Sequence, residues 1–205
     1  MKSLREYIDL IETVVDEEIV DEVSTEPSYP DWAKNQKIDK LGLQLIEKHG
    51  DIFFYKKESI DNIFYAATSR DILRVDEFIQ SDEKNLLTKD NGLIAYLILH
   101  KDEEGKHKRA FIFNIYVSQE YRGTGIAKKL YNFAILRDHM VLETNNQTLD
   151  SQNLWKFFIS QPNIYAVWVE KDDKIIAKNN DQNFLKAAYD GTSEVYLCIK
   201  KRGSQ

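Results

Sequence analysis

The residues best suited to chemistry lie in one stretch, Tyr121-Arg122-Gly123-Thr124-Gly125-Ile126-Ala127, between an apolar segment and an amphipathic one. The two glycines let backbone amides approach a ligand closely. A helix that begins at Ile126 presents unpaired N–H groups and the positive end of its dipole. Arg122 can add charge-assisted hydrogen bonds to a phosphate. The stretch therefore predicts a loop that binds a pyrophosphate group.

Two other kinds of nucleotide-binding loop use the same physics but need different residues. A dinucleotide-binding loop has a third glycine where Lys128 stands, and no Gly-Lys-Ser/Thr sequence is present here. The strand expected before the loop also comes out of an antiparallel meander, whereas both rival loops follow a strand of a parallel sheet. Both rivals are disfavoured, and the remaining alternative is a glycine-rich turn that caps a structural helix.

Apolar periodicity predicts the elements that position this loop. Asn91-Gly92 between two apolar runs is a strong hairpin signal, so residues 86–88, 93–99 and 110–117 are predicted to form a three-stranded antiparallel meander. Further strands are expected at 52–55, 60–67, 140–142, 164–169 and 194–199. Helices are expected at 32–48, 71–80, from 126 onward, at 150–160, and around 183–188 in a polar insertion spanning 171–192.

The N-terminal segment differs from the rest in charge and pattern. Residues 1–30 contain nine acidic and two basic residues, a net −7, so the other 175 residues sum to +1. Residues 3–20 read as an amphipathic helix with an apolar stripe of Leu4, Ile8, Ile11, Val15 and Ile19. Pro27 and Pro30 indicate a linker after it. We divide the chain into this helix and linker, 1–30, and one domain, 31–205. The helix either contacts a second copy or a protein partner, or completes the domain core.

Composition excludes several classes of protein. The 205 residues are 42% hydrophobic and 30% charged, which fits one globular domain. The sequence has no apolar run long enough to span a bilayer, no signal-peptide core, and no basic and aromatic cluster suited to nucleic acid. A single cysteine, Cys198, forms no internal disulfide and predicts no metal site. A cytoplasmic protein that binds neither membrane nor nucleic acid is expected.

The full stretch from Asn114 to Ala127 resembles motif A of the GNAT superfamily of N-acetyltransferases, whose signature is Arg/Gln-x-x-Gly-x-Gly/Ala. Ile115-Tyr116-Val117 stands where that family has the end of its Leu-Tyr-Val strand, and the resemblance covers about residues 85–170. It implies an α/β fold with a mixed sheet, in which an antiparallel meander leads into a splayed pair of parallel strands with helices on both faces. Acyl-coenzyme A would lie between the splayed strands.

The resemblance also implies roles for particular residues. Backbone groups of Ile115 and Val117 would hold the pantetheine arm. Backbone amides of the loop would hold the pyrophosphate of acetyl-CoA, the expected cosubstrate; these residues are Arg122, Gly123, Thr124, Gly125, Ile126 and Ala127. The reaction would transfer an acetyl group to an amine, either a small molecule or a protein.

Acetyl transfer needs a base for the amine and often an acid for the departing thiolate. Many family members take the acid from a tyrosine in the pattern Asn-x-x-Ala-x-x-Leu-Tyr, where this sequence has Ser151 and Phe158. Glu143 is the preferred candidate for the base and His139 the alternative. Tyr116 and Tyr165 are candidates for the acid, and Asn114 for orienting the substrate.

A second hypothesis is that the fold is retained as a binding or structural module without turnover. The missing tyrosine and the acidic extension motivate it. The first dozen residues are also similar to short leader segments of some tailed-bacteriophage proteins.

Overall fold

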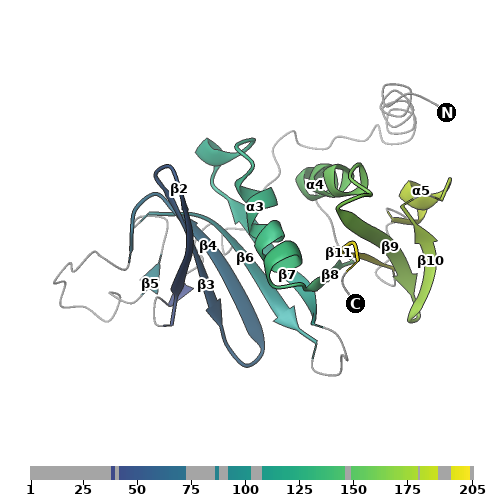
Figure 1. Ribbon diagram of the computed structural model, residues 1–205, viewed down its shortest axis with the longest axis horizontal. Coiled ribbons are helices and arrows are strands. Elements are labelled where there is room, and N and C mark those ends of the chain that lie inside the picture. Colours follow the sequence, from purple (N-terminus) through teal and green to yellow (C-terminus); the bar gives the residue numbers. More distant parts are fainter. Residues whose placement is uncertain are drawn as a thin grey trace, which may run out of the picture.

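The computed structural model describes residues 38–39, 42–72, 86–87, 92–102, 108–145, 149–179, 181–188 and 195–203. Their main feature is a nine-stranded sheet in the order β10-β9-β11-β8-β7-β6-β4-β3-β2 (Figure 1). The strands are β2 (Gln44–His49), β3 (Ile52–Glu58), β4 (Asn62–Thr68), β6 (Leu93–Lys101), β7 (Arg109–Val117), β8 (Val141–Thr144), β9 (Tyr165–Lys171), β10 (Lys174–Lys178) and β11 (Val195–Lys201).

Every neighbouring pair in this sheet is antiparallel except β7 and β8, which run parallel. The predicted fold class, an α/β fold in which an antiparallel meander leads into a parallel pair, is therefore confirmed.

The described helices lie on one face of the sheet, whereas helices were expected on both faces. The described helices are α3 (Ile126–Asn132), which continues into the π-helical turn η4 (Phe133–Arg137), α4 (Leu149–Ile159) and α5 (Phe184–Ala188). In Figure 1, α3 lies across β6 and β7, and α4 lies beside β9. One apolar cluster joins these helices to the sheet, with Leu130, Trp155 and Phe158 at or near zero exposure. This cluster fixes the start of α3 relative to the end of β7.

The opposite face has a second, smaller core. It contains Tyr55, Tyr96 and Tyr116, and it includes Ile38 from a separate two-stranded sheet of β1 (Ile38–Asp39) and β5 (Leu86–Leu87). The helix expected at 3–20 lies outside the described residues, as does nearly all of the helix expected at 71–80. Within the described residues, no helix is long and apolar enough to cross a membrane.

The predicted helix over residues 32–48 is wrong where the structure describes it. Gln44–His49 is instead the edge strand β2, which pairs with β3 through the register His49↔Ile52. Two residues, Gly50 and Asp51, make that connection, and Gly50 has φ 58°. A glycine at positive φ in a two-residue loop is the geometry of a tight hairpin. The residues that directly follow the predicted helix therefore form the β-turn between β2 and β3.

The predicted hairpin between residues 86–88 and 93–99 is also wrong. Leu86–Leu87 pairs with β1, whereas β6 pairs with β4 and β7. Gly92 (φ 102°) instead serves the β4–β6 junction, where Ser69 donates its N–H to the Gly92 carbonyl at 3.0 Å. A side chain on Gly92 would meet the Arg70 Cγ at 3.1 Å. The positive φ and the close approach of the Arg70 and Ser69 side chains explain this glycine.

The other predicted elements that the structure describes are confirmed within a few residues: β3, β4, β6, β7, α3, β8, α4, β9, α5 and β11. The strand β10 was missed inside the polar insertion. It follows a tight turn in which Asp172 and Asp173 both have positive φ, and it leaves Ile175 and Ile176 half exposed. Such a short, charged edge strand has little apolar periodicity to reveal it.

Candidate functional site

The parallel strands β7 and β8 separate part of the way along β7. They pair from Arg109↔Val141 to Phe111↔Glu143, while β7 continues to Val117. A bulge accompanies the separation, because the register with β6 moves from Leu99↔Ile112 to Ile98↔Asn114, which makes Phe113 the extra residue of β7. Bulges bend and twist the strand that carries them. The second half of β7 therefore leaves β8, which is the splay that the resemblance implied.

Beyond this point, every second residue of β7 points its backbone N–H and C=O groups toward the gap between β7 and β8. Ser118 donates its N–H to Ile94 of β6 at 2.8 Å. Hydrogen-bonding groups alternate between the two edges of a strand, so the N–H and C=O groups of Ile115 and Val117 point away from β6. The Val117 carbonyl accepts a hydrogen bond from Arg122 Nε at 3.4 Å. These two residues are the ones expected to hold an extended ligand.

The loop after β7 turns sharply into α3. Gly125 is the residue before the helix and has φ 85°, and among the described residues no side chain caps this end. The Lys129 N–H returns to the Gly125 carbonyl at 3.0 Å, which leaves the N–H groups of Ile126, Ala127 and Lys128 as the open first turn. Thr124 braces the loop by donating its hydroxyl to the Tyr121 carbonyl at 2.6 Å. The arrangement presents successive amides to an anion.

Both loop glycines are needed for conformation, and both border open space. Gly123 and Gly125 have φ 76° and 85°, a region that residues with a side chain rarely adopt. A Cβ built on either residue would meet no atom of the described residues within 4 Å. The space above these backbones is therefore free for a ligand to approach the amides.

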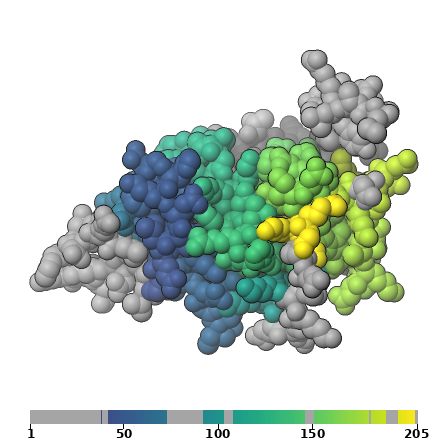
Figure 2. Space-filling model, in the orientation of Figure 1, coloured from purple at the N-terminus to yellow at the C-terminus, as the bar shows by residue number. Residues whose placement is uncertain are grey.

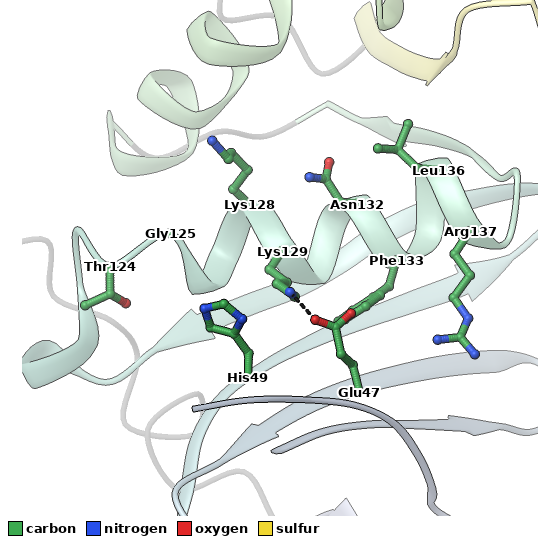
Figure 3. A pocket seen from close by; sticks show the side chains of 10 residues that line it. All are labelled: Glu47, His49, Thr124, Gly125, Lys128, Lys129, Asn132, Phe133, Leu136 and Arg137. Atoms are coloured by element: carbon green, nitrogen blue, oxygen red, sulfur yellow. Dashed lines mark hydrogen bonds and ion pairs between the residues drawn. The ribbon is translucent and has the colours of Figure 1, made fainter. Parts of the chain in front are cut away.

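A groove of about 620 Å³ opens from the loop along the outer side of α3 (Figure 3). Lys128, Lys129 and Arg137 line it from α3 and η4, and Glu47 and His49 line it from β2. Lys129 pairs with Glu47, Arg137 donates to the Ile46 carbonyl at 3.1 Å, and Lys128 lies 3.8 Å from the centre of the Phe157 ring. Figure 2 shows α3 between β2 and α4 on this surface.

Three cations against one carboxylate give this groove a positive charge in a chain of net charge −6. Such a surface favours an anionic ligand. Sequence reasoning missed it because Glu47 and His49 belong to the strand that was read as a helix, about 80 positions before α3. The two lysines after Ala127 were the only signal.

Glu143, the preferred base, lies on β8 at the last residue paired with β7. Its neighbour Leu142 packs under the helices, and side chains alternate along a strand, so Glu143 faces the opposite side of the sheet. There Arg109 Nε lies 3.2 Å from its carboxylate, and Arg109 Nη2 also pairs with Glu170 at 2.5 Å. Burial raises the pKa of Glu143, while the Arg109 charge opposes that shift. A carboxylate with a raised pKa is a stronger base than an exposed one.

Asn114 and Tyr116 point to the same face as Glu143. Asn114 donates its amide to the Tyr96 hydroxyl at 2.8 Å, and the rings of Tyr96 and Tyr116 stack with centres 5.7 Å apart. Tyr116 is 6% exposed. The fold therefore brings the three candidate catalytic residues to one side of the sheet, across from α3.

The remaining candidates lie in different surroundings. Phe158 is fully buried among Tyr131, Trp155 and Tyr165. The Tyr165 hydroxyl donates to Asn132 Oδ1 at 2.7 Å, and burial raises the pKa of Tyr165. His139 is exposed in the turn before β8, at the end of the sheet away from the loop. Within the described residues, no group of His, Cys, Asp or Glu side chains could hold a metal ion.

The chain is similar to several solved structures and matches the model of one family. Among solved structures, the chain is similar to Arabidopsis thaliana NAA60 in complex with acetyl-CoA, at 18% identity over 71% of this chain and 79% of that chain, with a TM-score of 0.37. It is similar to the ribosomal-protein-S18-alanine N-acetyltransferase from Escherichia coli, at 10% identity over 83% and 96%, with a TM-score of 0.35. It is also similar to the IAA acetyltransferase from Bacillus cereus ATCC 14579, at 13% identity over 69% and 78%, with a TM-score of 0.34.

No curated protein sequence matches the chain. The sequence identities and TM-scores of the solved structures are too low to assign the protein to a family. The assignment therefore rests on a family model of sequence. The model of the Acetyltransferase (GNAT) family matches residues 42–158, which is more than half of the chain. This protein therefore belongs to the GNAT family of acetyltransferases.

Proposed function

We propose that this chain is an acetyl-CoA-dependent N-acetyltransferase that acts on an amine, either a small molecule or a group on a protein. Acetyl-CoA is the cosubstrate of GNAT acetyltransferases. The observation that carries the proposal is the separation of β7 from β8 directly before a loop of open backbone amides. A strand edge beside an anion-binding turn suits a ligand with an extended amide-containing arm and a pyrophosphate.

The cosubstrate would be held by backbone and by charge. Ile115 and Val117 would pair with the amides of the pantetheine arm, as a further strand pairs with an edge. The amides from Gly123 to Ala127 would bind the pyrophosphate, with Thr124 bracing the loop and Arg122 adding a charge. The positive groove along α3 supports an anionic cosubstrate at this end of the domain.

The amine would approach from the side of the sheet that carries Glu143. Because Glu143 stands where the strands begin to separate, its carboxylate can take a proton from the attacking amine, directly or through water. The nitrogen then attacks the thioester carbon, the C–S bond breaks, and the coenzyme leaves as its thiolate. Asn114 and Tyr116 would position the acceptor on the same face.

Two measurements test the proposal together. Calorimetry with CoA and acetyl-CoA asks whether the site exists, and a thiol-release assay with a panel of amines asks whether transfer occurs. We expect binding of both forms of the coenzyme and release of CoA that depends on an amine. If neither form binds, the proposed site is wrong. Tight binding without transfer or hydrolysis would instead support a binding module without turnover, which the replacement of the usual tyrosine by Phe158 favours.

A further inference from the structure

The bulge in β7 leaves an aromatic side chain exposed at the centre of the sheet. Phe113 is the extra residue of that bulge and is 52% exposed, and β7 is the fifth of the nine strands. The other exposed large hydrophobic residues in the described ranges lie on the edge strands, in a turn, or directly before β9: Leu45, Ile60, Ile164, Ile175 and Ile176. Bulges occur next to active sites, where they re-aim a side chain. The position of Phe113 relative to the candidate site therefore indicates its use.

The ring of Phe113 lies on the same face of the sheet as Glu143. It contacts His100 of β6 edge-on, with ring centres 4.4 Å apart. The neighbour of His100, Leu99, packs under the helices, so the side chain of His100 points to the opposite face. His100 pairs with Phe111, which pairs in turn with Glu143 of β8. The contact with His100 therefore places Phe113 on the face that carries the candidate base, two residues beyond the last pair of β7 with β8.

The order of groups along β7 places Phe113 beside the reacting end of the coenzyme. In the proposed site the pyrophosphate binds after β7 and the arm lies along Val117 and Ile115, so the arm runs back toward Phe113. The thioester is at the end of that arm, near the point where the pairing of Glu143 with β7 ends. We propose that Phe113 binds the acceptor and selects primary amines that carry an aromatic or other large apolar group. This inference rests on the proposed function.

The acceptor uses two kinds of group on this face. Its nitrogen approaches Glu143, and its apolar group covers the exposed side of the Phe113 ring. Covering a half-exposed ring removes apolar surface from water, and two rings in offset or edge-on contact gain further attraction. Arg109 pairs with both Glu143 and Glu170, so this cluster carries two negative charges and one positive charge. That balance attracts an amine that arrives protonated.

Two sources of acceptor share this chemistry. A free arylalkylamine and the N-terminus of a peptide that begins with an aromatic residue both join a primary amine to an apolar ring. Phenethylamine and the peptide Phe-Gly-Gly represent these sources, and ethylamine and Gly-Gly-Gly are their counterparts without a ring. A higher kcat/KM for phenethylamine assigns the site to small amines, and a higher kcat/KM for Phe-Gly-Gly assigns it to peptide N-termini.

The first test compares these acceptors in the full chain and in variants. We expect the parent to prefer the acceptor with a ring over its counterpart by at least about tenfold in kcat/KM. Phe113→Ala should remove most of that preference, chiefly through KM, whereas Phe113→Tyr keeps the ring and should keep the preference. Ile176→Ala is the matched control, because Ile176 is 51% exposed but lies on the edge strand β10. It should behave like the parent.

A second test does not depend on turnover. Calorimetry measures the binding of phenethylamine and of Phe-Gly-Gly to the complex of the chain with CoA, which has no acetyl group to transfer. We expect Phe113→Ala to weaken binding of the preferred acceptor about tenfold, and Ile176→Ala to leave it unchanged. Both side chains are half exposed, so the melting temperature of each variant should stay within about 2 °C of the parent.

The outcomes separate this inference from the proposed function. If amines are acetylated without preference for a ring, or if Phe113→Ala keeps the preference of the parent, the assignment of Phe113 is wrong and the proposed function stands. If CoA binds but no amine is acetylated, the proposed transfer is wrong. Equal affinity of the parent and Phe113→Ala for both acceptors with a ring would then overturn the role of Phe113 as well. If CoA does not bind, the proposed function fails and this inference fails with it.

Discussion

A substitution at Gly125 tests most directly whether the loop binds the pyrophosphate of CoA. Its φ of 85° is left-handed, and a Cβ there would meet no atom within 4 Å in the part of the chain that the structure describes. Gly125→Val should therefore cost stability through backbone strain alone, about 1–2 kcal/mol. The new side chain would occupy the space through which a phosphate reaches the amides of Gly125 and Ile126. Each such charge-assisted hydrogen bond contributes about 1.5–3 kcal/mol, so losing two should weaken CoA binding by about 3 kcal/mol or more, at least about a hundredfold.

A matched control separates strain from blocked access. Gly203 has φ 81° and also no atom of the described ranges within 4 Å of its Cβ position, but it follows β11 at the other end of the domain. Gly203→Val should lose similar stability and keep the parent affinity for CoA. Calorimetry with CoA and thermal unfolding of both variants measure the two effects. Equal affinity of Gly125→Val and Gly203→Val for CoA would refute the assignment of the pyrophosphate to this loop.

The remaining predictions concern other groups. Arg122→Ala should weaken CoA binding less than Gly125→Val, by at most about 1.5–3 kcal/mol, because the backbone amides remain and the side chain is exposed; a larger loss in calorimetry would contradict this order. Glu143→Gln should lower kcat/KM by about 10²–10⁴ if Glu143 is the base. Because burial raises the pKa of Glu143, the acid limb of the parent's pH profile of kcat/KM should lie above the usual glutamate range. An acid limb within that range would count against Glu143 as the base. Arg109→Met leaves the carboxylates of Glu143 and Glu170 without their cation and should destabilise the fold by about 2–3 kcal/mol at pH 8. This loss of stability should shrink as the pH falls and Glu143 is protonated. Denaturant unfolding at pH 8 and pH 5 measures the loss, and equal losses at both pH values would argue against the ion pair. Deleting residues 1–24 should leave a folded domain that binds CoA if the acidic segment, predicted to be helical, is an interaction arm, whereas an insoluble remainder in expression trials would mean that this segment completes the core.

The loop and its strand could be predicted from sequence because their signals are local. Arg122-Gly123-Thr124-Gly125 requires two residues at positive φ, and the apolar run of β7 and the helical pattern after Gly125 fix the direction of the chain. Those features lie within about 25 residues and need no knowledge of distant partners. The separation of β7 from β8 followed from the resemblance to the family rather than from the residues themselves.

What escaped prediction depends on contacts between distant segments. Leu86–Leu87 has the composition of a hairpin strand, but its partner is Ile38–Asp39 rather than the strand that follows it. Gln44–His49 has an apolar pair, Leu45 and Ile46, that suits a helix as well as a strand; pairing with β3 decides between them. The positive groove joins α3 and η4 to β2, and the cluster of Arg109 with Glu143 and Glu170 joins three strands, so spacing along the chain did not predict either of them.

The position of the only cysteine bears on whether the acetyl group would be transferred through an acyl-enzyme or directly to the amine. An acyl-enzyme route needs a nucleophile at the separation of β7 and β8, and a thiolate is the usual one. Cys198 is fully buried on β11, and burial raises the pKa of its thiol well above the usual range, so little thiolate exists at neutral pH. The loop and groove that suit the cosubstrate belong to the α3 side, and Glu143, Asn114 and Tyr116 to the other. An acyl group held where the strands part is reachable from both sides of the sheet. This division favours direct transfer from the coenzyme sulfur to the amine while both ligands are bound.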